Sequence, residues 1–117
     1  MLIIKGLYTM QHQQRLINEI EEVKLTILNL LSQSAHLSHQ HLLSLLTQTV
    51  NAEWLDLAAQ KLGPEYGEYI QRMTTLEAAV SQIEIGQYGY CCDCEEPITT
   101  ALLELDPATQ RCEQCAK

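Results

Sequence analysis

The sequence predicts a mainly α-helical protein, built as a helical hairpin (coiled coil) or a three-helix bundle and followed by a small C-terminal four-cysteine finger. Three apolar stripes repeat at helical spacing. Leucine and isoleucine supply most of the apolar content, and phenylalanine is absent. Two Cys-x-x-Cys pairs lie near the C-terminus. We therefore expect a helical region over residues 1–86 and a finger over residues 87–117.

The first helix is expected from about Met10 to Leu31. Its apolar residues step by four, three, four and three, which places them on one stripe of the coiled-coil kind: Leu16, Ile20, Val23, Ile27 and Leu30. Charged residues lie off this stripe: Glu19, Glu21, Glu22 and Lys24. The polar, serine-rich segment from Ser32 to His41 is either a turn or a weak join in a longer helix.

Two further stripes follow. The second consists of Leu43, Leu46, Val50, Trp54 and Leu57, and we expect Trp54 in the core. Gly63-Pro64 then interrupts the pattern, because proline suits a first helical turn and glycine a position just past a helix end. A third helix is expected from near Pro64 to Gly86. Its stripe consists of Tyr66, Ile70, Met73, Leu76, Val80 and Ile83. Periodicity leaves the choice between hairpin and bundle open.

Charge and composition limit the partners. The net charge is -8, and the seven Lys and Arg residues are scattered. Nucleic acid as a direct partner is therefore not expected, since binding its phosphates requires clustered cations. No segment approaches the roughly 20 apolar residues that span a bilayer. The segment from Met1 to Met10 lacks the features of a signal peptide. We expect a cytoplasmic protein with reduced thiols and no membrane partner.

The strongest chemical pattern joins Cys91 and Cys94 to Cys112 and Cys115 across 17 residues. Two Cys-x-x-Cys turns at this separation supply the tetrahedral thiolate set of a structural zinc site. Protein ligands fill all four positions, which disfavours catalytic zinc. One zinc ion would contribute about 10–16 kcal/mol and fold the segment. Redox-active or disulfide-bonded pairs, or an iron–sulfur cluster, are the alternatives.

Other candidate residues have plainer interpretations. Cys92 is expected as a free thiol, with a redox nucleophile as the alternative. The group His36, His39 and His41 is expected as a polar turn, with metal binding as the alternative. The finger's apolar cluster is expected from Ile98, Leu102, Leu103 and Leu105. The sequence contains no phosphate loop, glycine-rich dinucleotide turn or nucleophile elbow, so we expect no enzyme.

The finger resembles that of the DksA/TraR family of bacterial transcription regulators. The match consists of the run from Gln87 to Cys94, then Ile98, Leu103, Pro107, Cys112 and Cys115. The resemblance implies a regulator that binds RNA polymerase without binding DNA. In the family a helical hairpin enters the secondary channel of the polymerase, and its acidic tip approaches the catalytic centre.

The family's tip motif is Asp-x-x-Asp-x-Ala, and the nearest match here runs from Glu53 to Ala58. The resemblance implies that Asp56 is the tip acid and Ala58 the tip alanine, with Glu53 replacing the first aspartate. The alternative function is a zinc-finger module that binds a protein other than polymerase.

Several positions depart from the family pattern. Residues that are basic in the family are Ala101, Leu102 and Asp106 here, and the residue after the last ligand is Ala116. Because those basic residues help to bind the anionic alarmone ppGpp, a response to ppGpp is doubtful. Glu95 replaces the glycine that usually follows the second ligand. The chain stops at Lys117, where the family has a trailing helix.

Overall fold

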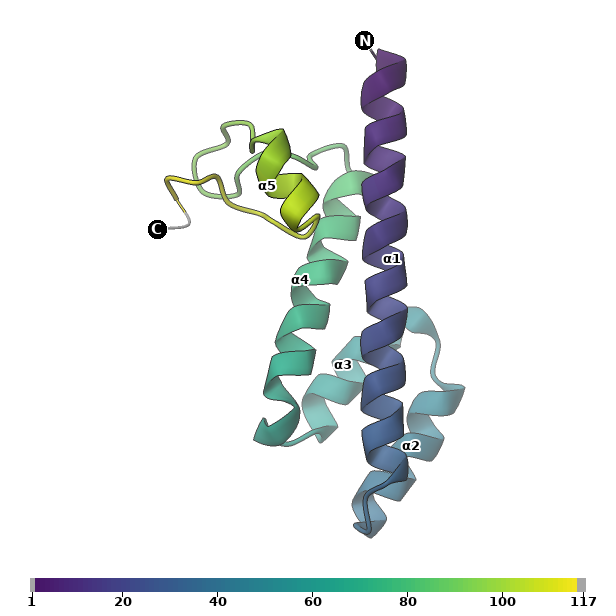
Figure 1. Ribbon diagram of the computed structural model, residues 1–117. Helices are drawn as coiled ribbons and strands as arrows, with labels where there is room; N and C mark the ends of the chain where they lie inside the picture. Colours follow the sequence, from purple (N-terminus) through teal and green to yellow (C-terminus); the bar gives the residue numbers. More distant parts are fainter. Residues whose placement is uncertain (1, 116–117) are drawn as a thin grey trace. The chain divides into compact units, whose positions relative to one another are not determined.

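The computed structural model describes the backbone of residues 2–115 and the side chains of residues 10–50 and 53–115. In chain order its helices are α1 (Leu2–Ser32), α2 (Leu37–Gln48), α3 (Asn51–Lys61), the 3₁₀ turn η1 (Pro64–Tyr66), α4 (Gly67–Glu84) and α5 (Thr100–Leu105) (Figure 1). The mainly α-helical prediction is confirmed. The predictions that concern Met1, Ala116 and Lys117 lie outside the described residues.

The chain divides into two compact units. A finger-bearing unit consists of Met1–Glu19 and Thr75–Lys117, and a four-helix unit consists of Ile20–Thr74. Helices α1 and α4 therefore each contribute residues to both units. The domain boundary between residues 86 and 87 stays a prediction.

The core of the four-helix unit draws on every helix in it. Its buried side chains are Ile27, Leu31, Leu42, Leu46, Trp54, Ala58, Tyr66 and Met73. Trp54 is 3% exposed, so its predicted place in the core is confirmed. Each large side chain of this kind contributes about 1.5–3 kcal/mol when it leaves water. The shared core, rather than helix propensity, therefore holds the short helices α2 and α3 in place.

The second apolar stripe does not form one helix, which corrects the sequence prediction. Helix α2 ends at Gln48 and α3 starts at Asn51, with Thr49 and Val50 in extended conformation between them. Val50 is 64% exposed, although it continues the stripe. The break turns the chain so that α2 and α3 contact each other and Leu46 and Trp54 reach the same core.

The polar segment after α1 contains a short turn. Helix α1 ends at Ser32, and α2 starts at Leu37, so the later histidines of the segment are helical. The Ser34 hydroxyl accepts the His36 N–H at 3.2 Å and hydrogen-bonds His39 Nδ1 at 2.7 Å. Serine stops helices in this way, because its hydroxyl offers the backbone a local partner outside the helix.

Lys24 is buried, whereas the stripe pattern had placed it with the polar residues outside the core. It is 7% exposed, and its Nζ atom lies 5.3 Å from the centroid of the Trp54 ring. An ammonium over a tryptophan face gains cation–π attraction, and the lysine stem covers apolar surface. Periodicity within α1 carries no information about this contact with α3.

Helix α4 begins and ends where the sequence predicts. Pro64 opens η1, which leads into α4. At the other end Gly86 has φ +79°, and its N–H donates to Ile83 O at 3.2 Å. The Gln87 N–H donates to Gln82 O at 2.8 Å. This pair of bonds is the Schellman motif, in which glycine takes the left-handed position.

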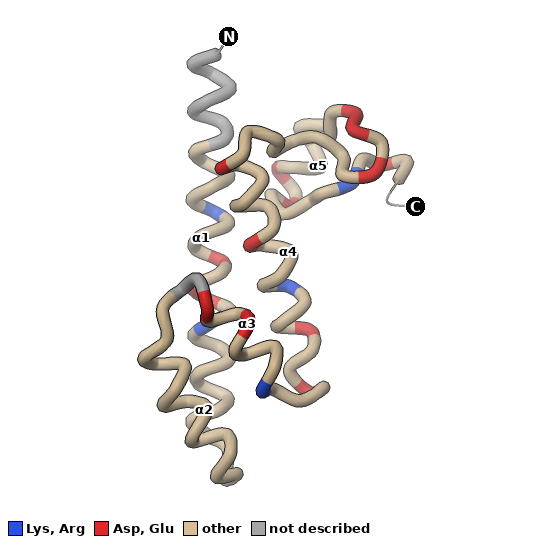
Figure 2. The backbone as a smooth tube through the Cα atoms, turned by 180° about the vertical axis from the view of Figure 1, so that it is seen from behind, with Lys and Arg blue, Asp and Glu red and all other residues tan. Residues whose placement is uncertain are grey.

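Acidic residues outnumber basic residues in the chain, 15 to seven. Figure 2 shows the few Lys and Arg positions separated from one another along the backbone, among more numerous Asp and Glu positions. Of the helices that the structure describes, none combines the length and the apolar character that crossing a bilayer requires.

Candidate metal centre

The finger starts with a tight chain reversal after α4. Gly89 has φ +94°, a left-handed conformation that glycine adopts without steric cost. The Ile98 N–H donates to Gly89 O at 2.7 Å, and Tyr90 forms an antiparallel bridge with Pro97. The reversal holds the first cysteine pair at the end of a narrow loop.

Backbone hydrogen bonds within this loop shape the first cysteine turn. The Cys91 N–H donates to Glu96 O at 2.8 Å, and the Glu95 N–H donates to Cys91 O at 2.9 Å. Glu95 has φ +64°, at the position where the family usually has glycine. A left-handed conformation costs a non-glycine residue about 1–2 kcal/mol, so the turn is kept despite an unfavourable residue.

Two contacts join the second cysteine pair to the first. The Cys92 N–H donates to Gln110 O at 2.8 Å. Arg111 Nε lies 3.0 Å from Asp93 Oδ2. The Gln110 side chain also donates to Thr75 O of α4 at 3.1 Å, so this segment of the finger is attached to a helix of its own unit.

A small apolar cluster supports the cysteines. Ile98 and Leu103 are buried with Cys91, and Tyr88 packs against them and donates its hydroxyl to Pro107 O at 2.7 Å. Leu105 is 81% exposed, so its predicted membership of the cluster is wrong. It is the last residue of the six-residue helix α5, and Leu103 already occupies the inward position.

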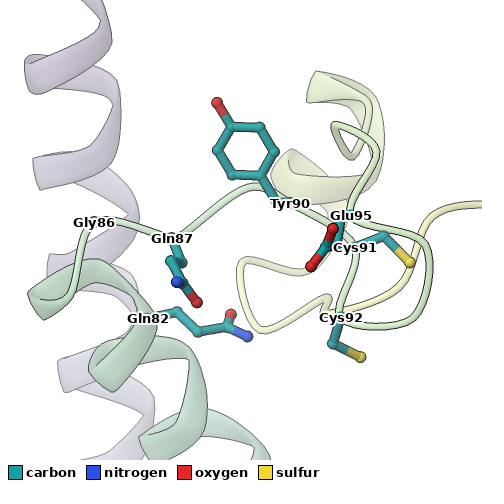
Figure 3. Close-up of a pocket in the computed structure, with 7 residues that line it drawn as sticks. All are labelled: Gln82, Gly86, Gln87, Tyr90, Cys91, Cys92 and Glu95. Carbon is teal, nitrogen blue, oxygen red and sulfur yellow. The ribbon is translucent and has the colours of Figure 1, made fainter.

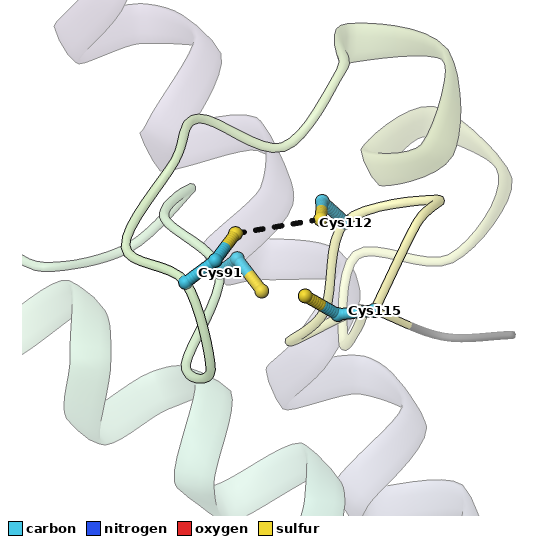
Figure 4. Close-up of side chains that lie close together, drawn as sticks. Cys91, Cys112 and Cys115 are labelled. Atoms are coloured by element: carbon cyan, nitrogen blue, oxygen red, sulfur yellow. Dashed lines mark hydrogen bonds between the residues drawn. The ribbon is translucent and has the colours of Figure 1, made fainter.

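The four predicted metal ligands converge. The Sγ atoms of Cys91, Cys94, Cys112 and Cys115 all lie within 4.8 Å of one another. In Figure 4 the sulfurs of Cys91, Cys112 and Cys115 are gathered in one region. The Cys94 and Cys112 sulfurs are 3.6 Å apart. A tetrahedron with metal–sulfur bonds of about 2.3 Å has edges of about 3.8 Å, so the thiols fit a single tetrahedral ion such as zinc.

The thiols are unequal as acids. Hydrogen bonds from the backbone N–H groups of Cys112 and Cys94 lower the pKa of Cys91 to about 6. The pKa of Cys94 is raised, because hydrogen bonding with the Cys112 thiol and burial outweigh a favourable bond from the backbone of Glu96. The neighbouring thiols of Cys112, Cys91 and Cys94 raise the pKa of Cys115. One thiolate therefore forms readily, and repulsion between neighbouring thiolates opposes further deprotonation. A bound cation would remove this repulsion.

The fifth cysteine lies outside this cluster. Cys92 is exposed, and its thiol is hydrogen-bonded to Arg111, whose pKa it raises together with the Asp93 carboxylate. Its predicted role as a free thiol stays a prediction.

The histidine group does not form a second metal cluster among the described residues, in which the four cysteines are the one group of suitable geometry. His36 and His41 are exposed, and His39 is partly buried beside Tyr66. His39 Nε2 lies 3.9 Å from Glu65 Oε1. The expected polar turn is found only up to His36, because His39 and His41 lie in the first turns of α2.

The residues that the resemblance assigns to a tip lie on α3. Glu53 and Asp56 are exposed, whereas Ala58 is 0% exposed and belongs to the core of the four-helix unit. The two carboxylates can therefore meet a partner, and Ala58 packs α3 against its neighbours. A partner role for these three residues stays a prediction.

Sequence reasoning gave no role to His12, which is 3% exposed in the finger-bearing unit. Its ring centroid lies 6.1 Å from that of Tyr88. Burial and the positive charge of Arg15 lower the pKa of His12 below its ordinary value of 6.5, and Glu104 partly opposes them. A polar residue four positions before Leu16, on the same helix face, is the one signal that could have indicated burial.

His12 should make folding sensitive to acid. Its pKa is lower in the folded state, so the unfolded chain binds more protons as the pH falls through 6.5. Stability is therefore highest above that pH, and it falls until the pH passes below the folded pKa. We expect His12→Gln to reduce the loss of unfolding free energy between pH 7.5 and pH 5.5, measured by urea denaturation. Thiol protonation affects the parent and the variant alike. An equal loss of unfolding free energy between pH 7.5 and pH 5.5 in the two proteins would therefore contradict this role.

Fold and site together define a helical protein with a four-cysteine finger. The structure is similar to that of the transcription factor DksA2 from Pseudomonas aeruginosa, with a TM-score of 0.60 and 16% sequence identity, over 94% of this chain and 81% of that one. The chain therefore has a DksA-like fold, in agreement with the family resemblance of its finger. No protein-family model matches the sequence, and no curated protein matches it.

Proposed function

We propose that this protein regulates bacterial transcription by binding RNA polymerase at the secondary channel, without binding DNA. The observation that carries the proposal is the DksA-like fold over 94% of the chain, combined with the converging cysteines. The acidic charge and the scattered cations also favour a protein partner over nucleic acid. On this proposal the protein is a regulator and not an enzyme.

The proposed cofactor is one structural Zn²⁺ held by Cys91, Cys94, Cys112 and Cys115. Bound zinc supplies folding free energy and takes no part in chemistry, because the four thiolates fill its coordination shell. Cys91 anchors the site from the buried side, and the backbone bonds around Glu95 and Glu96 orient it. The thiols need a reducing compartment, so we propose the cytoplasm.

The proposed contact residues are Asp56 and Glu53, with Ala58 fixing the helix that carries them. Both carboxylates face outward from α3, one turn apart. Trp54 and Ala58 face the core, so the orientation of the acidic face is set by packing. Carboxylates so held can reach basic groups or a metal ion in a partner cavity.

The proposal does not include ppGpp. Ala101 is exposed and Leu102 partly buried, at positions where the family has basic residues. Asp106 adds a carboxylate that accepts the Ala108 N–H at 2.9 Å. An anionic nucleotide finds no cation at these three positions.

Binding to purified core polymerase tests the proposal. We expect the zinc-loaded protein to bind bacterial core polymerase and to change promoter output in a reconstituted transcription assay. Asp56→Asn should retain binding and lose most of the effect on transcription, since it removes only a charge on an exposed face. Glu68→Gln, an exposed carboxylate on α4 of the same unit, is the control and should behave like the parent.

The same assay distinguishes the proposed function from the alternative, a zinc-finger module that binds another protein. Failure to bind polymerase, with the finger folded and zinc in place, would refute the proposal. It would leave a zinc-finger module for another protein partner. If Asp56→Asn and the parent both bind polymerase and change transcription equally, only the role of the acidic face is refuted.

A further inference from the structure

A pocket of about 370 Å³ lies between the end of α4 and the first cysteine turn, within the finger-bearing unit (Figure 3). Gln82, Gly86 and Gln87 line it from the helix side, and Cys91 and Glu95 from the finger side. The metal centre uses Cys91 alone of these residues. Neither the fold resemblance nor the proposed tip gives the pocket a function.

The side chains that line the pocket include one carboxylate and no cation, and the nearest cation described above, Arg111 beside Cys92, is paired with Asp93. Among the side chains of residues 10–50 and 53–115, Glu95 takes part in no ion pair or side-chain hydrogen bond, and no Lys, Arg or His lines the pocket. With metal bound, Cys91 is one of four thiolates around a divalent ion, a group of formal charge -2. The C-terminal end of α4 adds the negative end of a helix dipole, and its last turn holds no basic residue.

Polar side-chain groups face this region. In Figure 3 the Glu95 carboxylate is directed towards the space that the amide ends of Gln82 and Gln87 also enter, while the Tyr90 ring points away. The Schellman bonds at Gly86 fix the backbone that carries Gln87. The pocket thus offers a carboxylate on one side and two side-chain amides on the other, whose oxygens can accept hydrogen bonds once the amides rotate.

We propose that this pocket binds the guanidinium group of an arginine side chain on a protein partner. Arginine presents five donors in one plane, which can reach a carboxylate and separate amide oxygens at once, whereas lysine offers a compact point charge. Gly86, Gln87 and Glu95 are exposed, so the head group can enter while the rest of the ligand stays outside. The inference deepens the proposed function, on which it rests for a protein as the source of the arginine.

The backbone of Glu95 supports the assignment. A left-handed φ of +64° favours glycine, yet this position carries the one carboxylate in the pocket. The turn alone does not call for a glutamate. On this proposal its charge serves the pocket.

Titration of the zinc-loaded full chain by ¹H–¹⁵N NMR tests the pocket without polymerase. The probes are a blocked Gly-Arg-Gly peptide, its neutral citrulline analogue and free arginine. We expect the arginine peptide to shift the side-chain amides of Gln82 and Gln87 and the backbone amide of Glu95. Glu95→Gln should weaken this binding at least about threefold, as expected for a partly exposed charge pair. Glu96→Gln, one residue away and outside the pocket lining, should leave it unchanged.

Each other outcome overturns a stated part of the inference. Equal shifts with citrulline, or equal affinities of the two glutamate variants, would refute guanidinium recognition by Glu95. Tighter binding of free arginine than of the peptide would refute a protein side chain as the ligand. Loss of polymerase binding with intact peptide binding would refute the proposed function and leave the pocket standing.

Discussion

Cys91→Ser should abolish stoichiometric zinc binding and unfold the finger. Cys91 is 2% exposed, is hydrogen-bonded by backbone N–H groups and belongs to both the thiol cluster and the small apolar cluster. Its loss removes most of the roughly 10–16 kcal/mol that a structural zinc site supplies. We expect metal analysis to fall from one zinc per chain to near zero, and NMR signals of residues 87–115 to collapse.

Cys92→Ser is the matched control, because it changes a neighbouring exposed thiol outside the cluster. It should retain one zinc and a dispersed finger spectrum. The four-helix unit has its own core, so the helical signal of both variants should persist. A folded, zinc-loaded Cys91→Ser protein would contradict the ligand assignment.

Trp54→Ala should destabilise the four-helix unit by about 3–5 kcal/mol, the usual cost of removing a large aromatic side chain from a core. Trp54 is 3% exposed and connects α3 with the buried part of α1. Its removal also takes away the ring under the Lys24 ammonium. Urea denaturation followed by circular dichroism measures the change, because the chain's single tryptophan is lost as a fluorescent probe.

Leu37→Ala provides the comparison for this measurement. Leu37 lies on α2 of the same unit and is 79% exposed, so its removal should change stability by less than about 0.5 kcal/mol. Similar unfolding midpoints for the two variants would show that Trp54 does not hold the core together.

The sequence indicated those features that depend on local spacing. The four ligands follow from two cysteine turns, and the ends of α4 follow from Pro64 and Gly86, whose backbone preferences act over a few residues. Trp54 was placed in the core from its position on a stripe. These predictions need no knowledge of which helix packs on which.

The features that the sequence did not reveal depend on contacts between distant segments. The stripe from Leu43 to Leu57 runs in phase across Thr49 and Val50, so periodicity gave no sign of a break there. Lys24 and His12 are buried by residues 30 and 76 positions away, Trp54 and Tyr88. The strained backbone of Glu95 is likewise set by the folded turn.

Position 95 places two properties of the finger in opposition. Glycine there would relax the turn and favour the metal-bound fold, while emptying the adjoining pocket of its carboxylate. Selection for thermal stability alone would therefore favour glycine at this position. The resulting protein would be more stable and would bind cationic partners more weakly.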